Sequence, residues 1–484
     1  MKLYKWMQLL GKIYFIILIF IMVSVNLSGK ERNYELQDKI LTVLTNTGFE
    51  EWKKATSSDS RLVSKIIIKN GITFIPSLIF KDMKQVKEVS LPASVREIGI
   101  GSFWGCTNLL SVNFAKNSSL RKISKYAFYK SALTSIKIPS SVVIIEKAAF
   151  LYCKNLSSID FMENSKLKTI ESKAFWGSAL TSIIIPSSVV NIQDQVFRKC
   201  EKLSKVVFKS ANIKVINEWA FAETGLRKIS IPASVITIEK TAFTNCKKLI
   251  SVTFSGINLK KNGAGAFSRT ALTSIIIPAS VVSIGERAFR YCNQLSNVRF
   301  LGSNLHTIEE WTFSQTGLTS IKIPASVKSI EGTAFTDCRN LSFVEFEENS
   351  ALKIIGPAAF YGTNISSITL PDSLSVIGPG AFSQSTLRSI QISSSVKKIE
   401  EGAFAASTLL SVTIPSSVIN IQKEAFYNCP NLREVIFLSE RAPHNFGVNV
   451  FDFCPALVTI YIPKNSKDYK GGNWEKYKNI IRYQ

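Results

Sequence analysis

Short segments in which apolar and polar residues alternate recur along most of the chain. The residues from Leu272 to Ile277, and again from Leu318 to Ile323, follow the pattern L-x-x-I-x-I, which is short, β-branched and alternating. A segment of this kind is typical of a β-strand. Proline follows each one, at Pro278 and Pro324, and ends the strand because it cannot donate a hydrogen bond to a ladder.

The residues after each proline follow a second pattern, S-V-x-x-I-x-x-x-A-F, which predicts a turn of α- or 3₁₀-helix on the opposite side. The repeats align on the final phenylalanine, and consecutive phenylalanines are 22, 24 or 25 residues apart. The aligned residues are Phe103, Phe128, Phe150, Phe175, Phe197, Phe221, Phe243, Phe267, Phe289, Phe313, Phe335, Phe360, Phe382, Phe404, Phe426 and Phe451. A degenerate copy with Phe80 lies in residues 62–91, so the alignment predicts about seventeen coils.

One strand and one return in every 22–25 residues is the pattern of a leucine-rich-repeat coil. A single coil cannot bury its own apolar edges, so neighbouring coils must stack. The sequence therefore predicts an α/β repeat fold, a leucine-rich-repeat solenoid. We expect a curved parallel β-sheet on its concave side and short helical or 3₁₀ returns on its convex side. With strands about 4.8 Å apart, the coils form an arc on the order of 80 Å long.

The repeats are predicted to occupy residues 62–463, and the segments on either side are predicted to cap the ends of the solenoid. Residues 30–61 are predicted to form a helical cap, because four apolar residues have helical spacing. These residues are Leu36, Ile40, Val43 and Leu44. Residues 464–484 are predicted to fold over the last strand through Tyr469, Trp474, Tyr477 and Ile481.

The first 29 residues have the features of a targeting segment. Three lysines precede an apolar run over residues 13–25, and small residues follow near residue 29. This arrangement is typical of a secretory signal peptide, so we expect a secreted or cell-surface protein. The apolar run is shorter than the roughly 20 residues that cross a membrane. An uncleaved signal anchor is the alternative, and it would be the only predicted contact with a membrane.

The complete motif, L-x-x-I-x-I-P-x-S-V-x-x-I-x-x-x-A-F-x-x-C, resembles the BspA-like leucine-rich repeats of bacterial and protozoan surface proteins. The resemblance covers residues 62–463, and the A-F-x-x-C element is specific to that class. The tail from Ile460 to Pro463, followed by Tyr469 and Trp474, is similar to the closing strand and cap of bacterial members. The resemblance implies a secreted or surface protein that takes part in adhesion to host matrix or to other cells.

Eight cysteines each lie three residues after a repeat phenylalanine, where the other coils have serine or threonine. They are Cys106, Cys153, Cys200, Cys246, Cys292, Cys338, Cys429 and Cys454. Most neighbouring cysteines are two coils apart, or about 9.6 Å, whereas a disulfide needs Cα atoms within about 7 Å. We therefore expect isolated buried thiols. At most one disulfide is predicted, between Cys429 and Cys454 on adjacent coils.

Few residues of the chain are suited to catalysis or metal binding. His306 and His444 are its only histidines, and the sequence places no nucleophile beside either of them. The motifs of phosphate-binding loops, serine hydrolases and zinc proteases are absent from the sequence. No cysteine pair or histidine has the spacing of a zinc site. We expect no enzymatic activity, no cofactor and no bound metal.

The formal net charge of +24 bears on the choice of partner. A secreted protein this basic is attracted to polyanions such as sulfated glycans, acidic envelope polymers or anionic membranes. The alternative is that the lysines keep a long apolar solenoid soluble. Nucleic-acid binding is not expected, because it favours a concentrated basic stripe with interleaved aromatic residues, whereas these lysines are scattered over many coils.

The outward residues of the predicted sheet form the remaining candidate surface. Serine and threonine fill twenty-four of its forty-eight positions. Their hydroxyl groups either stabilise neighbouring strands or offer a flat polar face to a protein or an anionic glycan. Basic residues outnumber acidic ones there, and two aromatic residues are the best contact anchors. The candidate binding residues are Lys137, Lys205, Arg227, Lys228, Arg299, Lys322, Arg388 and Arg433, with Phe343 and Tyr461 as the aromatic anchors.

Two functions fit these observations. The first is a non-catalytic binding or adhesion module for an extracellular protein or glycan of a host or a neighbouring cell. The alternative is a structural envelope or matrix protein that self-associates through its repeat surface. The sequence fixes neither the ligand nor the oligomeric state.

Overall fold

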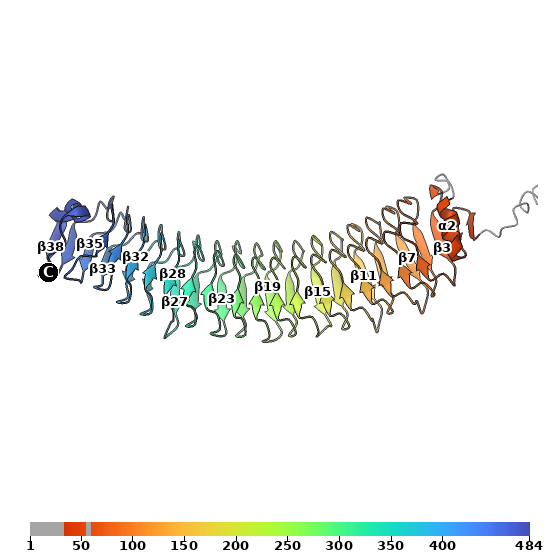
Figure 1. Ribbon diagram of the computed structural model, residues 1–484, viewed down its shortest axis with the longest axis horizontal. Coiled ribbons are helices and arrows are strands. Elements are labelled where there is room, and N and C mark those ends of the chain that lie inside the picture. Colours follow the sequence, from red (N-terminus) through yellow and green to blue (C-terminus); the bar gives the residue numbers. More distant parts are fainter. Residues whose placement is uncertain (1–32, 55–59) are drawn as a thin grey trace, which may run out of the picture.

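The computed structural model describes residues 33–54 and 60–484. The chain forms an elongated, gently curved solenoid in which successive strands lie side by side (Figure 1). The predicted arc of stacked coils is therefore confirmed. The expected signal peptide, residues 1–29, lies outside the described residues.

Nineteen strands of three or four residues, one in each coil, form the broader face of the described solenoid. They are β2 (Ile40–Val43), β3 (Lys65–Ile68), β5 (Glu88–Leu91), β7 (Ser111–Phe114), β9 (Ser135–Ile138), β11 (Ser158–Phe161), β13 (Ser182–Ile185), β15 (Lys205–Phe208), β17 (Lys228–Ile231), β19 (Ser251–Phe254), β21 (Ser274–Ile277), β23 (Asn297–Phe300), β25 (Ser320–Ile323), β27 (Phe343–Phe346), β29 (Ser367–Thr369), β31 (Ser389–Gln391), β33 (Ser411–Ile414), β35 (Glu434–Phe437) and β37 (Thr459–Ile462). The alignment on phenylalanine counts two coils fewer. It assigns the coil of Phe49 to the N-terminal cap and does not count the closing strand β37.

Proline limits the hydrogen bonding of this face. A ladder of four residues joins β5 to β7, for example. Just past β7, the Ala115 amide also donates to the Leu91 carbonyl at 3.0 Å. A proline at the position of Ala115 has no N–H to donate. Strands followed by proline pair with the preceding strand over only three residues (β5 and β37) or form no ladder with it (β9, β13, β17, β21, β25, β29 and β33). Strand β31 is followed by Ile392 and Ser393 instead, and it does pair with β29.

The returns contain strands of two residues rather than the expected turns of helix. They are β4 (Phe74–Ile75), β6 (Glu97–Ile98), β8 (Lys122–Ile123), β10 (Ile144–Ile145), β12 (Thr169–Ile170), β14 (Asn191–Ile192), β16 (Val215–Ile216), β18 (Thr237–Ile238), β20 (Lys261–Asn262), β22 (Ser283–Ile284), β24 (Thr307–Ile308), β26 (Ser329–Ile330), β28 (Ile354–Ile355), β30 (Val376–Ile377), β32 (Lys398–Ile399), β34 (Asn420–Ile421) and β36 (Asn445–Phe446). They form a second set of parallel ladders.

The backbone around each repeat phenylalanine explains why no helix forms there. From Phe80 to Phe451, the residues two before and two after the phenylalanine have positive φ, as at Tyr126 (57°) and Lys130 (57°). A left-handed residue at these places stops a right-handed helix. The amides bond to the next coil instead, for example Phe128 N to Ala149 O at 2.8 Å. The apolar residues that are three to four positions apart in each return thus lie in consecutive turns rather than in a helix.

A continuous column of phenylalanine rings forms the centre of the core. From Phe80 to Phe451 the rings of successive coils are stacked, with centroids 5.0 to 5.7 Å apart. Aromatic pairs of this kind stabilise by about 0.5–1.5 kcal/mol beyond the burial of their area. The isoleucines and valines of both strand sets pack around the column.

The N-terminal end differs from the expected arrangement. Strands β1 (Tyr34–Gln37) and β2 form an antiparallel hairpin, and helix α2 (Asn46–Lys54) follows it. The helix expected over Leu36, Ile40, Val43 and Leu44 is therefore not formed there. Asp38 and Lys39 both have positive φ, at 50° and 67°, as a two-residue hairpin turn requires. Such a turn normally contains glycine or asparagine, so Asp38 and Lys39 did not indicate a hairpin.

The C-terminal segment covers the last coil. Strand β38 (Ile481–Tyr483) pairs in parallel with β37, and the 3₁₀ helix η1 (Gly472–Ile480) precedes it. Tyr469, Trp474 and Tyr477 are buried, and the Trp474 ring stacks on Phe446 with centroids 3.8 Å apart. The tail thereby removes the final apolar edge from water, as a terminal cap of a solenoid must.

Candidate ligand-binding face

The broad strands have one buried and one exposed side. In β9, Ile136 and Ile138 are buried, whereas Ser135 and Lys137 are exposed. The same alternation recurs in most of the other strands, so their outward side chains form a long ribbon on one surface. We call this surface the strand face.

All ten predicted binding residues lie on the strand face or at its strand ends. Nine are exposed, and Tyr461 is half-buried beside Arg482 of β38. They do not form one cluster, because they are spread from β9 to β37. Only neighbours such as Arg227, Lys228 and Lys205 come from adjacent coils.

Part of the predicted positive charge is balanced locally. Lys322 lies opposite Glu345 in the β25–β27 ladder, and its Nζ is 2.6 Å from Oε1 of that glutamate. The nearby carboxylate raises the pKa of Lys322 above its usual value. Lys137 is likewise opposite Asp160 across β9 and β11. Both pairs are exposed, so each contributes little to stability.

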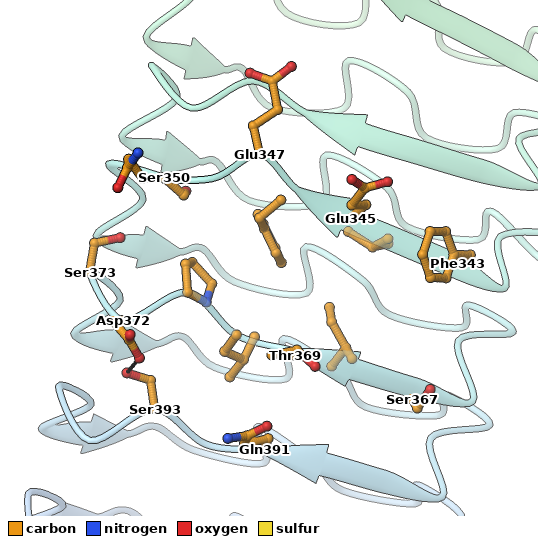
Figure 2. Close-up of a pocket in the computed structure, with 16 residues that line it drawn as sticks. Phe343, Glu345, Glu347, Ser350, Ser367, Thr369, Asp372, Ser373, Gln391 and Ser393 are labelled. Atoms are coloured by element: carbon orange, nitrogen blue, oxygen red, sulfur yellow. Dashed lines mark hydrogen bonds between the residues drawn. The ribbon is translucent and has the colours of Figure 1, made fainter.

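A hollow of about 670 Å³ lies on the strand face between β27, β29 and β31. Figure 2 shows Phe343 and Glu345 on β27, Thr369 on β29 and Gln391 on β31 around it. Phe343 is 56% exposed at one end of the hollow. This apolar ring beside several carboxylate, amide and hydroxyl groups is the most varied chemistry on the face. It includes one of the two predicted aromatic anchors.

The hollow lies where the ladder between neighbouring broad strands is interrupted, next to the proline that follows β29. Pro371 lines the hollow, and β27 and β29 form no ladder with each other. A second hollow, of about 550 Å³, lies at the corresponding interruption between β19 and β21, and it is lined by Pro278. The two differ in chemistry. Glu345, Glu347 and Asp372 line the first, whereas the second is mainly apolar, with half-exposed Ile276. Neither hollow was predicted from the sequence.

The carboxylates of the first hollow already have partners. Besides the Lys322 pair, Oε2 of Glu347 accepts a hydrogen bond from the Ala325 amide at 3.0 Å. Ser393 donates to Asp372 at 3.5 Å. These contacts fix the acidic groups in place, so the hollow is a preformed surface of hydrogen-bond acceptors beside an apolar ring.

The cysteines have a structural role at the coil corners. All eight carry free thiols, seven of them buried and Cys454 half-buried. The prediction of isolated buried thiols is confirmed for most of them, and the optional Cys429–Cys454 disulfide is not formed. In one corner, Sγ of Cys292 donates to the Phe267 carbonyl at 3.2 Å. The Thr270 hydroxyl donates to the same carbonyl at 2.9 Å and lies 3.2 Å from the sulfur.

This corner repeats along the solenoid and explains the alternation of cysteine with serine or threonine. At Phe221 and Phe267, the threonine hydroxyl and the thiol of the next coil donate to the same buried carbonyl. At other corners the thiol donates to the carbonyl and the hydroxyl lies beside the sulfur, as for Ser131 and Cys153. Burial raises the pKa of the Cys153 thiol to about 12 and those of Cys200, Cys246, Cys292 and Cys338 to about 11. A thiol with so high a pKa is a poor nucleophile near neutral pH.

Aromatic residues next to the repeat phenylalanines pack along one edge of the solenoid. Trp104 lies 4.7 Å from Tyr129, and the Arg198 guanidinium lies over the rings of Trp176 and Trp219 at 5.1 and 4.2 Å. These side chains are half-buried. Because their faces already contact neighbours, Trp104 and Trp176 pack at the coil edges rather than stand free as contact anchors.

The structure gathers no catalytic or metal-binding groups around the two histidines. His306 is exposed, with Nδ1 3.3 Å from the Ser326 carbonyl. His444 is exposed near the C-terminal cap. Within residues 33–54 and 60–484, no three His, Cys, Asp or Glu side chains gather as a metal site would require. No helix in the same residues is long and apolar enough to cross a membrane.

A family model for the BspA-type leucine-rich repeat region, in six copies, matches residues 53–166, 121–250, 260–352 and 353–480. The chain belongs to the BspA-type leucine-rich repeat family. The resemblance noted from the A-F-x-x-C motif is thereby confirmed. The leucine-rich-repeat solenoid of this family is in general a scaffold for interactions rather than a catalytic fold.

Comparison with solved structures finds similar leucine-rich repeat proteins. A leucine-rich repeat protein from Bacteroides ovatus is 21% identical with a TM-score of 0.54, and the match covers 94% of this chain and 98% of that one. A leucine-rich cell surface protein from Faecalibacterium prausnitzii is 24% identical with a TM-score of 0.39, covering 93% and 97%. No curated protein matches the sequence.

Proposed function

We propose that this BspA-type protein is a secreted or cell-surface binding and adhesion module. Its ligand, a protein or an anionic glycan of a host or a neighbouring cell, lies across the strand face. The observation that carries the proposal is the half-exposed Phe343 beside a preformed polar hollow. Interface hot spots are typically aromatic or arginine anchors surrounded by polar groups.

The rest of the strand face supports the same function. Its outward hydroxyl groups and its basic residues, including Arg388 and Arg433, offer hydrogen-bond donors over many coils. The backbone beneath them is held by ladders and by the phenylalanine column, so little conformational entropy is lost on binding. A rigid, extended surface of this kind suits a long ligand. It needs neither a cofactor nor a catalytic group.

The proposal is tested by displaying the full chain on cells and probing arrays of glycans and matrix proteins. Replacement of Phe343→Ser should weaken binding of the ligand so found by about tenfold, because an aromatic anchor contributes about 1–2 kcal/mol or more. The matched control is Leu110→Ser, which removes a similarly exposed apolar side chain on a distant coil of the same face. Equal losses in the two variants, or no ligand on either array, would overturn the proposal.

Self-association of a matrix protein is the competing function. It predicts concentration-dependent assembly in sedimentation experiments, and Phe343→Ser should then shift that assembly. A protein that stays monomeric over the tested concentrations, and still adheres when displayed, supports the binding module instead.

A further inference from the structure

A second surface, apart from the strand face, shows a regular pattern of charge. In most returns, the residue just before the two-residue strand is exposed and bonds through its backbone to the same place on the next coil. The Lys168 amide donates to the Val143 carbonyl at 2.8 Å, and the Val190 amide donates to the Lys168 carbonyl at 3.0 Å. The bonds are interrupted just before Lys214 and just before His306, where the short strands form no ladder. These residues follow the curve of the solenoid in one column, which we call the return column.

The return column contains only basic, aliphatic and small polar residues between β6 and β34. In order they are Arg96, Arg121, Val143, Lys168, Val190, Lys214, Ile236, Lys260, Val282, His306, Lys328, Lys353, Ser375, Lys397 and Ile419. Not one of them is acidic. In the central part, cations and aliphatic side chains alternate from coil to coil.

The cations of the return column have no carboxylate partners within the described part of the chain. Ion pairs are formed by other lysines of the returns, such as Lys122, which contacts both Glu97 and Glu146 at 3.1 and 3.2 Å. The glutamates that follow the short strands have other partners as well: Glu171 accepts a hydrogen bond from the Lys147 amide at 2.9 Å. The positive charge of the column is therefore left for an external partner.

The spacing of the charges selects the kind of partner. Arg121, Lys168, Lys214 and Lys260 lie two coils apart from one another, or about 9.6 Å for strands 4.8 Å apart. Double-stranded DNA carries a charge about every 1.7 Å of its axis, and each strand carries one about every 3.4 Å. The column also lacks the aromatic residues on which bases stack. A sparsely charged polymer fits the column better than a nucleic acid does.

We infer that the return column binds a linear anionic polysaccharide with about one acidic group per ~10 Å of chain. Its acidic groups would pair with successive cations, and the C–H faces of the sugar rings between them would cover the exposed valines and isoleucines. The inference shares with the proposed function the expectation of an extracellular location and an anionic glycan as one of its possible ligands. It uses a different surface and different residues.

The test measures binding of the full chain to hyaluronan oligosaccharides, which carry one carboxylate per disaccharide. The first variant is the triple replacement of Lys168→Ser, Lys214→Ser and Lys260→Ser. The matched control replaces Lys154→Ser, Lys202→Ser and Lys247→Ser, three exposed lysines that lie two coils apart and belong to neither surface, so that both variants lose the same charge. Each exposed ion pair contributes up to about 1 kcal/mol, so the first variant should bind about tenfold more weakly and respond less to salt.

Three outcomes decide the inference. Weaker binding in the return-column variant alone, with affinity rising until the oligosaccharide spans the about 29 Å of four cations, supports it. Equal losses in both variants mean that only the net charge matters and overturn it. Tighter binding of an oligonucleotide of equal charge than of the oligosaccharide also overturns it. None of these outcomes depends on Phe343, so the strand-face proposal is judged separately.

Discussion

From Cys106 to Thr363 the solenoid alternates two kinds of coil that solve the same packing problem differently. A cysteine coil has a loop one residue longer, and its strand usually ends in phenylalanine without a following proline, as at β19. A serine or threonine coil is shorter, and proline usually follows its strand, as after β21. Both place one phenylalanine in the same column, and both satisfy the same corner carbonyl. The difference teaches that the column and the corner are the fixed elements, while the loop and the ladder can vary.

The phenylalanine column should be equally important in both kinds of coil. Phe289 of a cysteine coil and Phe267 of a threonine coil are both fully buried. Replacement of either by alanine should lower the free energy of unfolding by about 3–5 kcal/mol, because it leaves a large cavity. Chemical denaturation monitored by circular dichroism measures this. A difference of several kcal/mol between the two variants would contradict the equivalence.

The two kinds of coil should differ in how their stability changes at alkaline pH. The pKa of the Cys292 thiol is about 11 in the folded protein, against an ordinary value of 9.0. Because the folded-state pKa is the higher one, this thiol contributes its full stability below pH 9 and loses it as the pH rises through 11. At pH 11 the loss is about 2 kcal/mol for one such thiol.

Denaturation midpoints of the unmodified chain and of Cys292→Ala, measured between pH 7 and 11, isolate this effect. The variant is less stable at neutral pH, but its stability should fall less steeply as the pH rises. The matched control is Thr270→Ala, which removes the hydroxyl partner and leaves the thiol, and it should keep the steep fall. Parallel pH curves for all three proteins would show that the thiol does not titrate on unfolding.

The shared corner predicts a smaller effect for the hydroxyl. Thr270→Val keeps the shape of the side chain but removes the donor to the Phe267 carbonyl. The Cys292 thiol still donates to that oxygen, so the loss should be about 1 kcal/mol, as for one net hydrogen bond. The exposed Thr273→Val is the control and should change stability by less than about 0.5 kcal/mol. A loss above 3 kcal/mol would mean that the thiol cannot serve the carbonyl alone.

The smallest effect is expected at the prolines. Pro278→Ala adds an amide facing the carbonyl of Phe254 at the end of β19. The new hydrogen bond and the extra freedom of the unfolded chain each amount to about 0.5–1 kcal/mol and oppose each other, so stability should change little. Hydrogen exchange should nevertheless show the new amide protected. An unprotected amide would mean that something other than the missing donor keeps β19 and β21 apart.

The sequence predicted the parts of the fold that depend on apolar periodicity. The strands, the phenylalanine column and the buried cysteines are read directly from side chains that must leave water. The left-handed residues around each phenylalanine were only partly predictable, because glycine stands at some of these positions, as at Gly101 and Gly105, whereas lysine, tyrosine or tryptophan stands at others. The hairpin at Asp38 and Lys39 was missed because no glycine stands in its turn.

The candidate surfaces were only partly predictable. The ten candidate binding residues lie on the outward side of the strands, as strand alternation predicts. The hollow beside Phe343 depends on how far β27 and β29 separate, which no local pattern reports. The return column could have been found from the recurring basic residue before each x-I pair, such as Lys168 and Lys214. The predicted binding surface included only positions on the strands.

The stacking of coils also sets a distance. Within the column each phenylalanine ring stacks on the ring before and the ring after it, and the backbone ladders likewise join neighbouring coils. The molecule therefore behaves as a spacer built from identical increments: removal of one cysteine coil with its threonine partner would shorten it by about 10 Å and leave every remaining contact in register. The number of repeats in such a chain sets the distance between the C-terminal cap and the N-terminal end of the solenoid.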